Sequence, residues 1–177
     1  MRPALGWILL IGGALLAVIG FCDAGTAWWT QYQADAAAVN DGVAVPEGFV
    51  SRLSIPRLDA SLYVVTAETA RDLKRGPGYI RGSVGPGERG NCIIAGHRDL
   101  HFRVLKDIQV GDEIELQTKQ DRLSYKVSSI DIVSPDNRGA LRAVYPEQLT
   151  LVTCFPFYYV GPAPKRFIVK AYRLKHS

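Results

Sequence analysis

The chain has 177 residues, of which 47% are hydrophobic and 21% are charged, so it has enough apolar residues to fill the core of one domain. Its formal net charge is +4, but the basic residues are spread along the chain rather than clustered with aromatic residues. The composition excludes a disordered tail, and the spread of the basic residues argues against a nucleic-acid-binding protein.

The first segment with a clear pattern is an uncharged apolar stretch at residues 4–22. About 19 residues in a helix nearly match the ~30 Å hydrocarbon core of a bilayer. A basic residue precedes the stretch, and an acidic residue and three aromatic residues follow it, as is typical of a membrane interface. We therefore predict a single-pass membrane anchor at residues 1–22, with the bulk of the chain on the extracytoplasmic side. The flanking residues are Arg2, Asp23, Trp28, Trp29 and Tyr32.

A cleaved signal peptide is the competing interpretation of this N-terminus. The apolar region of a signal peptide is usually about 7 to 15 residues long and ends at a small-x-small site. Such a site, Ala-Asp-Ala, occurs at residues 34–36, well past the apolar stretch. A lipoprotein signal fits poorly because Phe21, a large residue, precedes Cys22. An uncleaved anchor is favoured, and cleavage stays open.

Residues 23–48 are polar and alanine-rich without a strand pattern, and we interpret them as a linker. The folded domain is predicted at residues 49–177, where short β-type runs alternate with Gly, Pro, Asn and Asp. Helix is expected only at residues 66–75, with a further turn at 101–108. The sequence thus predicts a mainly β domain, a largely antiparallel barrel or sandwich. The expected strands lie at residues 49–55, 61–65, 92–96, 112–118, 123–133, 149–154 and 166–174.

The three cysteines of the chain are Cys22, Cys92 and Cys154. An odd count outside the cell leaves at least one thiol unpaired or paired between chains. Cys22 lies at the edge of the apolar stretch and Cys92 in a strand that reads as buried, so both have simple apolar interpretations. A disulfide between Cys92 and Cys154, which would indicate a redox or structural module, stays open as an alternative.

Cys154 differs because it closes a strand just before Pro156, which cannot continue a strand ladder. Reactive groups are often displayed at strand ends and loops. His97 also follows the end of a strand. If these two strands are neighbours in the sheet, the thiol and the imidazole can meet, and they form the minimal pair for covalent acyl chemistry.

Arg166 begins the strand that follows Cys154, across a loop of eleven residues, 155–165. A hairpin would bring this guanidinium back beside the thiol, where a cation favours the thiolate and stabilises a developing oxyanion. The neighbouring Lys165 would point to the opposite face. Cys154, His97 and Arg166 are therefore the candidate catalytic residues.

Several segments of the domain resemble the sortases, the membrane-anchored cysteine transpeptidases of bacterial cell surfaces, and most closely those of class D. The segments are "RGPGYI", "NCIIAGHRDLHFRVLKDIQVGDEIEL" and "TLVTCFPFYYVGPAPKRFIVKA", in the family's order. The resemblance implies an eight-stranded β-barrel with one or two short helices. It places the family's nucleophile, histidine and arginine on Cys154, His97 and Arg166.

The resemblance also implies a reaction and its partners. A sortase cleaves an LPxTG-like sorting motif after its threonine, forms a thioacyl enzyme and transfers the acyl group to an amine. The expected partners are surface or pilin proteins with a C-terminal sorting signal, an amine acceptor such as a peptidoglycan precursor, and the bacterial cytoplasmic membrane. The alternative is a membrane-anchored β-barrel that binds a peptide or wall component without chemistry.

No cofactor or metal is predicted. His97 and His101 are four residues apart, but Gly96 and the preceding strand argue against a helix, and no third ligand is evident. Some sortases use calcium, yet the carboxylates before the last two strands match no dedicated calcium loop. These carboxylates are Asp131, Asp136 and Glu147. Asp99 lies close to His97 in sequence, but its spacing does not assure that it faces the ring.

Overall fold

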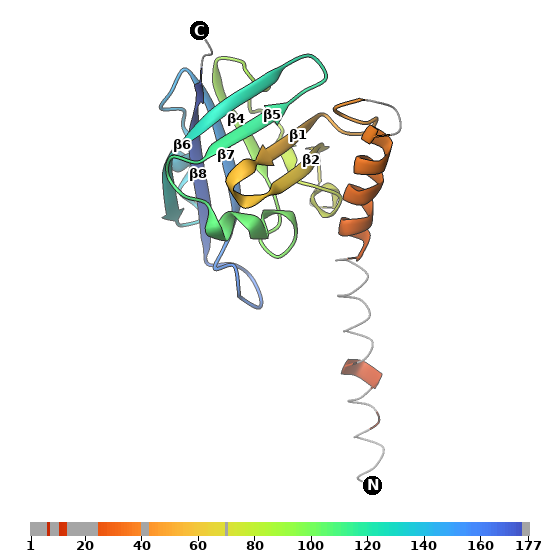
Figure 1. The fold of residues 1–177 in the computed structure, drawn as a ribbon. Helices are drawn as coiled ribbons and strands as arrows, with labels where there is room; N and C mark the ends of the chain where they lie inside the picture. The colour runs from red at the N-terminus through yellow and green to blue at the C-terminus, as the bar shows by residue number, and fades with distance from the viewer. Residues whose placement is uncertain (1–6, 8–10, 14–24, 40–42, 70, 175–177) are drawn as a thin grey trace.

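The computed structural model describes residues 7, 11–13, 25–39, 43–69 and 71–174. Eight strands close into one barrel in the order β1-β2-β3-β4-β7-β8-β6-β5 (Figure 1). The mainly β, eight-stranded barrel expected from the sequence is confirmed. The strands are β1 (Ser51–Ile55), β2 (Ala60–Ala67), β3 (Gly78–Ile80), β4 (Gly90–Ala95), β5 (Glu113–Gln117), β6 (Arg122–Val133), β7 (Glu147–Phe155) and β8 (Lys165–Leu174). The 3-10 helices are η1 (Pro56–Leu58), η2 (Asp72–Lys74), η3 (His101–Asp107) and η4 (Arg138–Leu141).

Alternation along the strands fixes which face of each strand lines the core. In β8, Phe167 and Val169 belong to the barrel core, whereas Arg166 between the turn and Phe167 does not. In β7, Leu149 and Leu151 belong to the same core. Because successive side chains of a strand point to opposite faces, residues one position away lie on the outer face of the barrel.

The connection from β4 to β7 determines the topology around the last two strands. β4 pairs with β7 in parallel, so the intervening chain, which includes β5 and β6, must cross from one end of the barrel to the other. β7 then pairs with β8 in an antiparallel hairpin. β7 therefore lies between β4 and β8, although β4 is distant from both in sequence.

Two local expectations differ from the structure. The helix expected at residues 66–75 is reduced to η2, because β2 continues to Ala67 and the chain turns towards β3. β3 itself was not expected, because it has only three residues and no run of alternating residues. It is held by pairing with β2 on one side and β4 on the other.

Residues 25–39 form a helix beside the barrel (Figure 1), within the segment that the sequence analysis interpreted as a linker. The side-chain amide of Gln31 makes two hydrogen bonds with the backbone of Tyr63. Its Oε1 accepts from the Tyr63 N–H at 2.7 Å, and its Nε2 donates to the Tyr63 carbonyl at 3.2 Å. Ala34 packs into a second apolar cluster with Phe49 and Tyr63. This helix thus completes hydrogen bonds of β2 where β3 does not reach.

The predicted anchor at residues 1–22 lies outside the described residues, apart from 7 and 11–13. Within the part of the chain that the structure describes, no helix has the length and apolar character needed to cross a membrane. The division into anchor, linker and domain at residues 22 and 48 stays a prediction.

Candidate active site

Cys154 and Arg166 are direct partners across the β7–β8 hairpin. The register pairs Cys154 with Arg166 and Phe155 with Lys165. Since Leu151 and Val169 point into the core, Cys154 and Arg166 both lie on the outer face, and Lys165 points to the other face. Side chains directly opposite each other in an antiparallel pair have Cβ atoms about 4.5–5.5 Å apart. The hairpin predicted from the sequence therefore places Cys154 and Arg166 directly opposite each other on one face of the sheet.

His97 reaches the same region from the other side of β7. β4 ends with Ala95 opposite Val152, and the next residue, Gly96, still donates its N–H to the Val152 carbonyl at 3.1 Å. The buried hydroxyl of Thr153 donates to the Gly96 carbonyl at 2.7 Å. Two hydrogen bonds to β7 thus fix the backbone immediately before His97, and continuing the parallel register brings His97 level with Cys154.

Gly96 is needed here because the backbone passes close to an aromatic ring. A Cβ atom added at Gly96 would lie 2.7 Å from ring atoms of Phe102. Phe102 is fully buried in η3, the helical segment that the sequence predicted as a turn. The glycine therefore lets η3 fold back under the end of β4, and this contact sets the direction in which the chain leaves the strand at His97.

The three candidate residues lie at one end of the barrel, Cys154 on β7, Arg166 on β8 and His97 just after the end of β4. All three are partly buried, so they are accessible without being fully solvated. The Arg166 guanidinium donates through Nη1 to the carbonyls of Ala163 and Lys165, at 3.4 and 3.1 Å. This arrangement offers a thiol for attack, an imidazole for proton transfer and a fixed cation for an oxyanion.

The aromatic residues after Cys154 divide into two groups. Phe155 and Phe157 pack with Phe167, with ring centroids 5.2 to 6.2 Å apart, and so extend the barrel core. Tyr158 and Tyr159 are exposed in the β7–β8 loop. Phe155 and Phe157 therefore pack on the core side of the β7–β8 hairpin. Tyr158 and Tyr159 are exposed and available to contact a substrate.

Arg98 and Arg103 also contribute to this region, although no motif in the sequence marks them. Each guanidinium lies over a tyrosine of the β7–β8 loop: Arg98 over Tyr159 and Arg103 over Tyr158. The only signal in the sequence was that Arg98 follows His97, and adjacency alone does not indicate a contact with a loop some 60 residues later.

The possible disulfide between Cys92 and Cys154 is not formed, since both thiols are free. Cys92 points into the core opposite Leu149, whereas Cys154 lies farther along β7 on the outer face. Burial, with a smaller contribution from Glu88, raises the pKa of the Cys92 thiol to about 12. Cys92 is therefore a protonated core residue at neutral pH.

We expect this difference to appear in thiol labelling. With iodoacetamide at pH 8, native protein should be modified at Cys154 and at least about 100-fold more slowly at Cys92, because the thiolate is the reactive form and Cys92 is both buried and protonated. Raising the pH from 8 to 10 should leave Cys92 unlabelled, since its pKa lies higher still. Peptide mapping by mass spectrometry identifies each site, and labelling in 8 M urea is the control. Equal labelling of both residues in the native protein would contradict this assignment.

The residues considered for metal binding do not form a cluster. Among the described residues, no group of three or more His, Cys, Asp or Glu side chains is arranged to hold a metal ion. His101 lies in η3 with both ring nitrogens buried, and burial lowers its pKa. Glu147 lies 3.8 Å from Arg173, and Asp131 accepts from Ser129. The absence of a cofactor remains a prediction.

Asp99 does not orient the histidine in this structure. Its side chain is exposed, and no hydrogen bond between the described residues joins it to His97. It instead lines a cavity of about 470 Å³ between the segment after His97 and the β7–β8 loop, together with Arg103 and residues 157–160.

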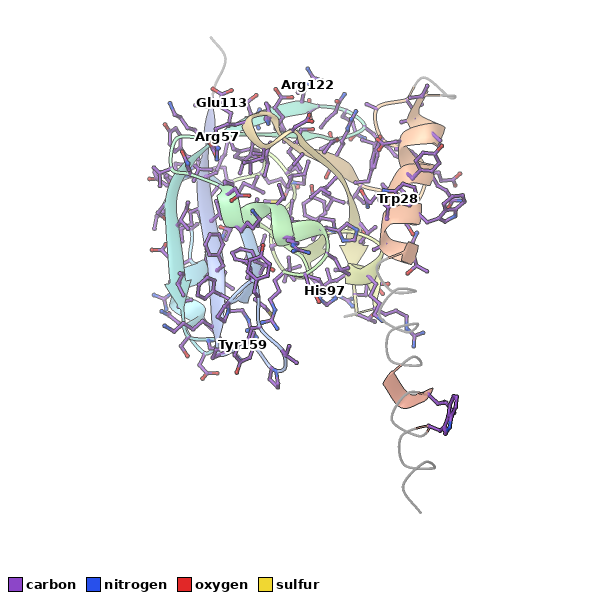
Figure 2. The ribbon with its side chains drawn as sticks, turned by 60° about the horizontal axis from the view of Figure 1, so that its bottom comes forward. Trp28, Arg57, His97, Glu113, Arg122 and Tyr159 are labelled. Carbon is purple, nitrogen blue, oxygen red and sulfur yellow. The ribbon has the colours of Figure 1, made fainter. Side chains whose placement is uncertain are left out.

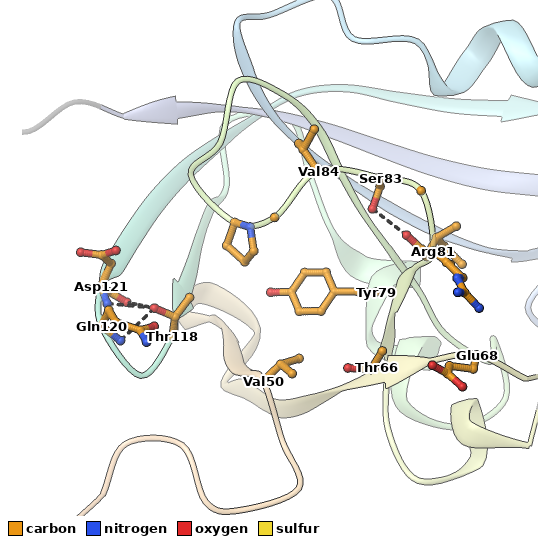
Figure 3. A pocket seen from close by; sticks show the side chains of 14 residues that line it. Val50, Thr66, Glu68, Tyr79, Arg81, Ser83, Val84, Thr118, Gln120 and Asp121 are labelled. Carbon is orange, nitrogen blue, oxygen red and sulfur yellow. Dashed lines mark hydrogen bonds between the residues drawn. The ribbon is translucent and has the colours of Figure 1, made fainter.

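A second hollow, of about 530 Å³, surrounds Tyr79 (Figure 3). The loop from Arg81 to Pro86 forms one side and the β5–β6 turn forms another. This loop precedes Gly90 at the start of β4, whereas His97 follows the end of β4, so the hollow lies away from Cys154. The Tyr79 hydroxyl is bound to Ser51 at 2.8 Å, and burial raises its pKa. None of the candidate catalytic residues lines this hollow.

Comparison with known families agrees with this geometry. The sortase domain model matches residues 53–174, from β1 to the end of β8. The chain belongs to the sortase family. The match includes His97, Cys154 and Arg166, and the resemblance seen in the sequence motifs is confirmed.

Individual sortases are similar to this one at moderate identity. Sortase D of Bacillus subtilis is 36% identical over 123 residues, which cover 69% of this chain and 62% of that protein. The chain thus spans less than two thirds of the length of that relative. Among solved structures, sortase C-1 from Actinomyces oris superimposes with a TM-score of 0.66 at 28% identity, covering 73% of this chain and 76% of the other. The pilus-related sortase C of Group B Streptococcus gives a TM-score of 0.67 at 25% identity, covering 75% and 71%.

Proposed function

We propose that this sortase is a cysteine transpeptidase that cleaves an LPxTG-like sorting motif through a thioacyl intermediate on Cys154. The observation that carries the proposal is the placement of Cys154 opposite Arg166, with His97 arriving from the other neighbouring strand. A protein that only bound a peptide would not need a thiol, an imidazole and a guanidinium at one strand end.

In the first half-reaction the Cys154 thiolate attacks the carbonyl carbon of the motif's threonine. Arg166 stabilises the negative charge that develops on the carbonyl oxygen. His97, as imidazolium, donates a proton to the departing glycine nitrogen as the C–N bond breaks. The products are a thioester on Cys154, a free amine on the released peptide and a neutral imidazole.

In the second half-reaction an amine attacks the thioester carbonyl. His97 takes the proton from the attacking nitrogen, the C–S bond breaks, and the thiolate and the imidazolium are restored. The net change is exchange of one amide for another, so no oxidant or cofactor is needed. If water attacks instead, the outcome is hydrolysis.

The substrates and the location follow from this proposal. The donors would be surface or pilin proteins with a C-terminal sorting signal, and the acceptor an amine of a peptidoglycan precursor or a pilin lysine. The apolar stretch at residues 4–22 supports a single-pass anchor in the bacterial cytoplasmic membrane, with the barrel outside. A division into an anchor at residues 1–22, a connecting segment at 23–48 and a catalytic barrel at 49–177 fits this location.

Intact-protein mass spectrometry tests the proposal directly. The full chain in detergent micelles is mixed with LPxTG-like peptides, with and without an amine acceptor such as triglycine. An adduct with the mass of the peptide up to its threonine is expected, and the amine should convert it to a transfer product. The alternative, a barrel that binds a peptide or wall component without chemistry, predicts bound peptide with no covalent adduct.

A further inference from the structure

Arg98 joins the segment after His97 to the β7–β8 loop through its guanidinium. Its Nη2 donates to the carbonyls of Tyr159 and Gly161, at 2.8 and 3.1 Å. The same guanidinium lies 5.6 Å from the centroid of the Tyr159 ring. A planar guanidinium can make two hydrogen bonds and stack on a ring at once, which a lysine ammonium cannot do.

Arg103 makes a parallel contact from η3. Its guanidinium carbon lies 5.2 Å from the centroid of the Tyr158 ring. Two successive tyrosines of the loop are therefore each covered by an arginine from the segment that follows β4. Phe157 packs on the core, but Tyr158 is 70% exposed, so beyond Phe157 this part of the loop is held by the arginine contacts rather than by burial.

The loop held in this way connects the two strands that carry Cys154 and Arg166. Residues 157–160 of the loop also line the 470 Å³ cavity, together with Asp99 and Arg103 from the segment after His97. Figure 2 shows His97 and Tyr159 towards the same end of the barrel. The loop thus links this cavity to the two strand ends that carry Cys154 and Arg166.

We infer that Arg98 is a positioning residue that locks the β7–β8 loop onto the segment after His97 and so fixes the rim through which substrate reaches Cys154. Arg98 acts through the loop and does not touch the reacting atoms. The inference rests on the proposed function only for its effect on substrate, because the lock itself is a property of the fold.

Removing the lock should loosen the loop without changing the thiol. In Arg98→Ala, cleavage of the native full chain by chymotrypsin after Tyr158 or Tyr159 should become about tenfold faster, because two charge-assisted hydrogen bonds are lost. KM for a fluorogenic LPxTG-like peptide should rise by about fivefold or more with kcat changed less, because a loosened rim binds substrate poorly. The rate of Cys154 alkylation by iodoacetamide should stay within about twofold of the wild type, since the pair with Arg166 is intact.

Arg122→Ala is the matched control. Arg122 starts β6, whose other end at Val133 pairs with Arg166, so it lies at the far end of the barrel (Figure 2). Its chymotrypsin cleavage rate and KM should match the wild type. Arg98→Lys should resemble Arg98→Ala, whereas Tyr159→Phe, which keeps the ring face, should resemble the wild type.

The outcomes separate this inference from the proposed function. Unchanged loop cleavage in Arg98→Ala, equal acceleration in Arg122→Ala, or a large fall in Cys154 alkylation would overturn the lock. If the wild type forms no acyl adduct with any peptide, the proposed function fails, and the chymotrypsin rates still decide whether Arg98 holds the loop.

Discussion

Replacing Cys154 with alanine should abolish the acyl adduct and lower turnover of a sorting peptide by at least about 10⁴-fold, because no other group can form the thioester. The fold should be unaffected, since Cys154 lies on the outer face and removal of its sulfur leaves no cavity in the core. Intact-mass analysis of the adduct and a fluorogenic peptide assay measure the two effects.

Cys92→Ala provides the matched control for the loss of a thiol. Cys92 is buried in the core opposite Leu149, so this variant should be less stable in urea by about 1–2 kcal/mol yet keep its acyl adduct. If Cys154→Ala retained the adduct, or if Cys92→Ala lost it while folded, Cys154 would not be the nucleophile.

The second large effect is expected at Arg166. Arg166→Lys should reduce the acylation rate by about 10²–10³-fold, the usual cost of losing an oxyanion donor. The substitution keeps the positive charge but loses the planar guanidinium, which has further N–H donors besides the Nη1 that binds the Ala163 and Lys165 carbonyls. Rapid-quench measurement of thioacyl formation isolates this step from transfer to the amine.

Lys165→Ala tests whether the position matters more than the charge. Lys165 is adjacent in sequence, but its partner in the register is Phe155 and it points to the opposite face. Its acylation rate should stay within about threefold of the wild type, as expected for an exposed surface position. Equal losses in both variants would indicate a general electrostatic effect and contradict a specific role for Arg166.

Seven of the eight strands could be predicted because their residues alternate and turn residues separate them, whereas the three-residue β3 has no such pattern. The pairing of Cys154 with Arg166 followed from the hairpin, which is a local feature. The sequence could not show that β4 lies beside β7, because a parallel pairing between distant segments leaves no local pattern. The meeting of His97 and Cys154 was therefore predicted only on the assumption that their strands are neighbours. The sortase motifs supplied this relation through resemblance.

Two features could not be predicted because they depend on packing across the chain. The helix at residues 25–39 has an alanine-rich, polar sequence, and it is held by Gln31 and by a small apolar cluster on the barrel. Its stability comes from these tertiary contacts more than from its own periodicity. The contact of Arg98 with the β7–β8 loop is likewise invisible in a sequence that shows only its position after His97.

The parallel pairing of β4 with β7 has a consequence for when the chain acquires its chemistry. The hydrogen bond from Thr153 to the carbonyl before His97 joins residues 57 positions apart, and two further strands lie between them. Contacts of such long sequence separation require closure of a large loop and form late in folding. Arg166 comes opposite Cys154 as soon as the β7–β8 hairpin forms, but His97 reaches the thiol only once β4 has paired with β7.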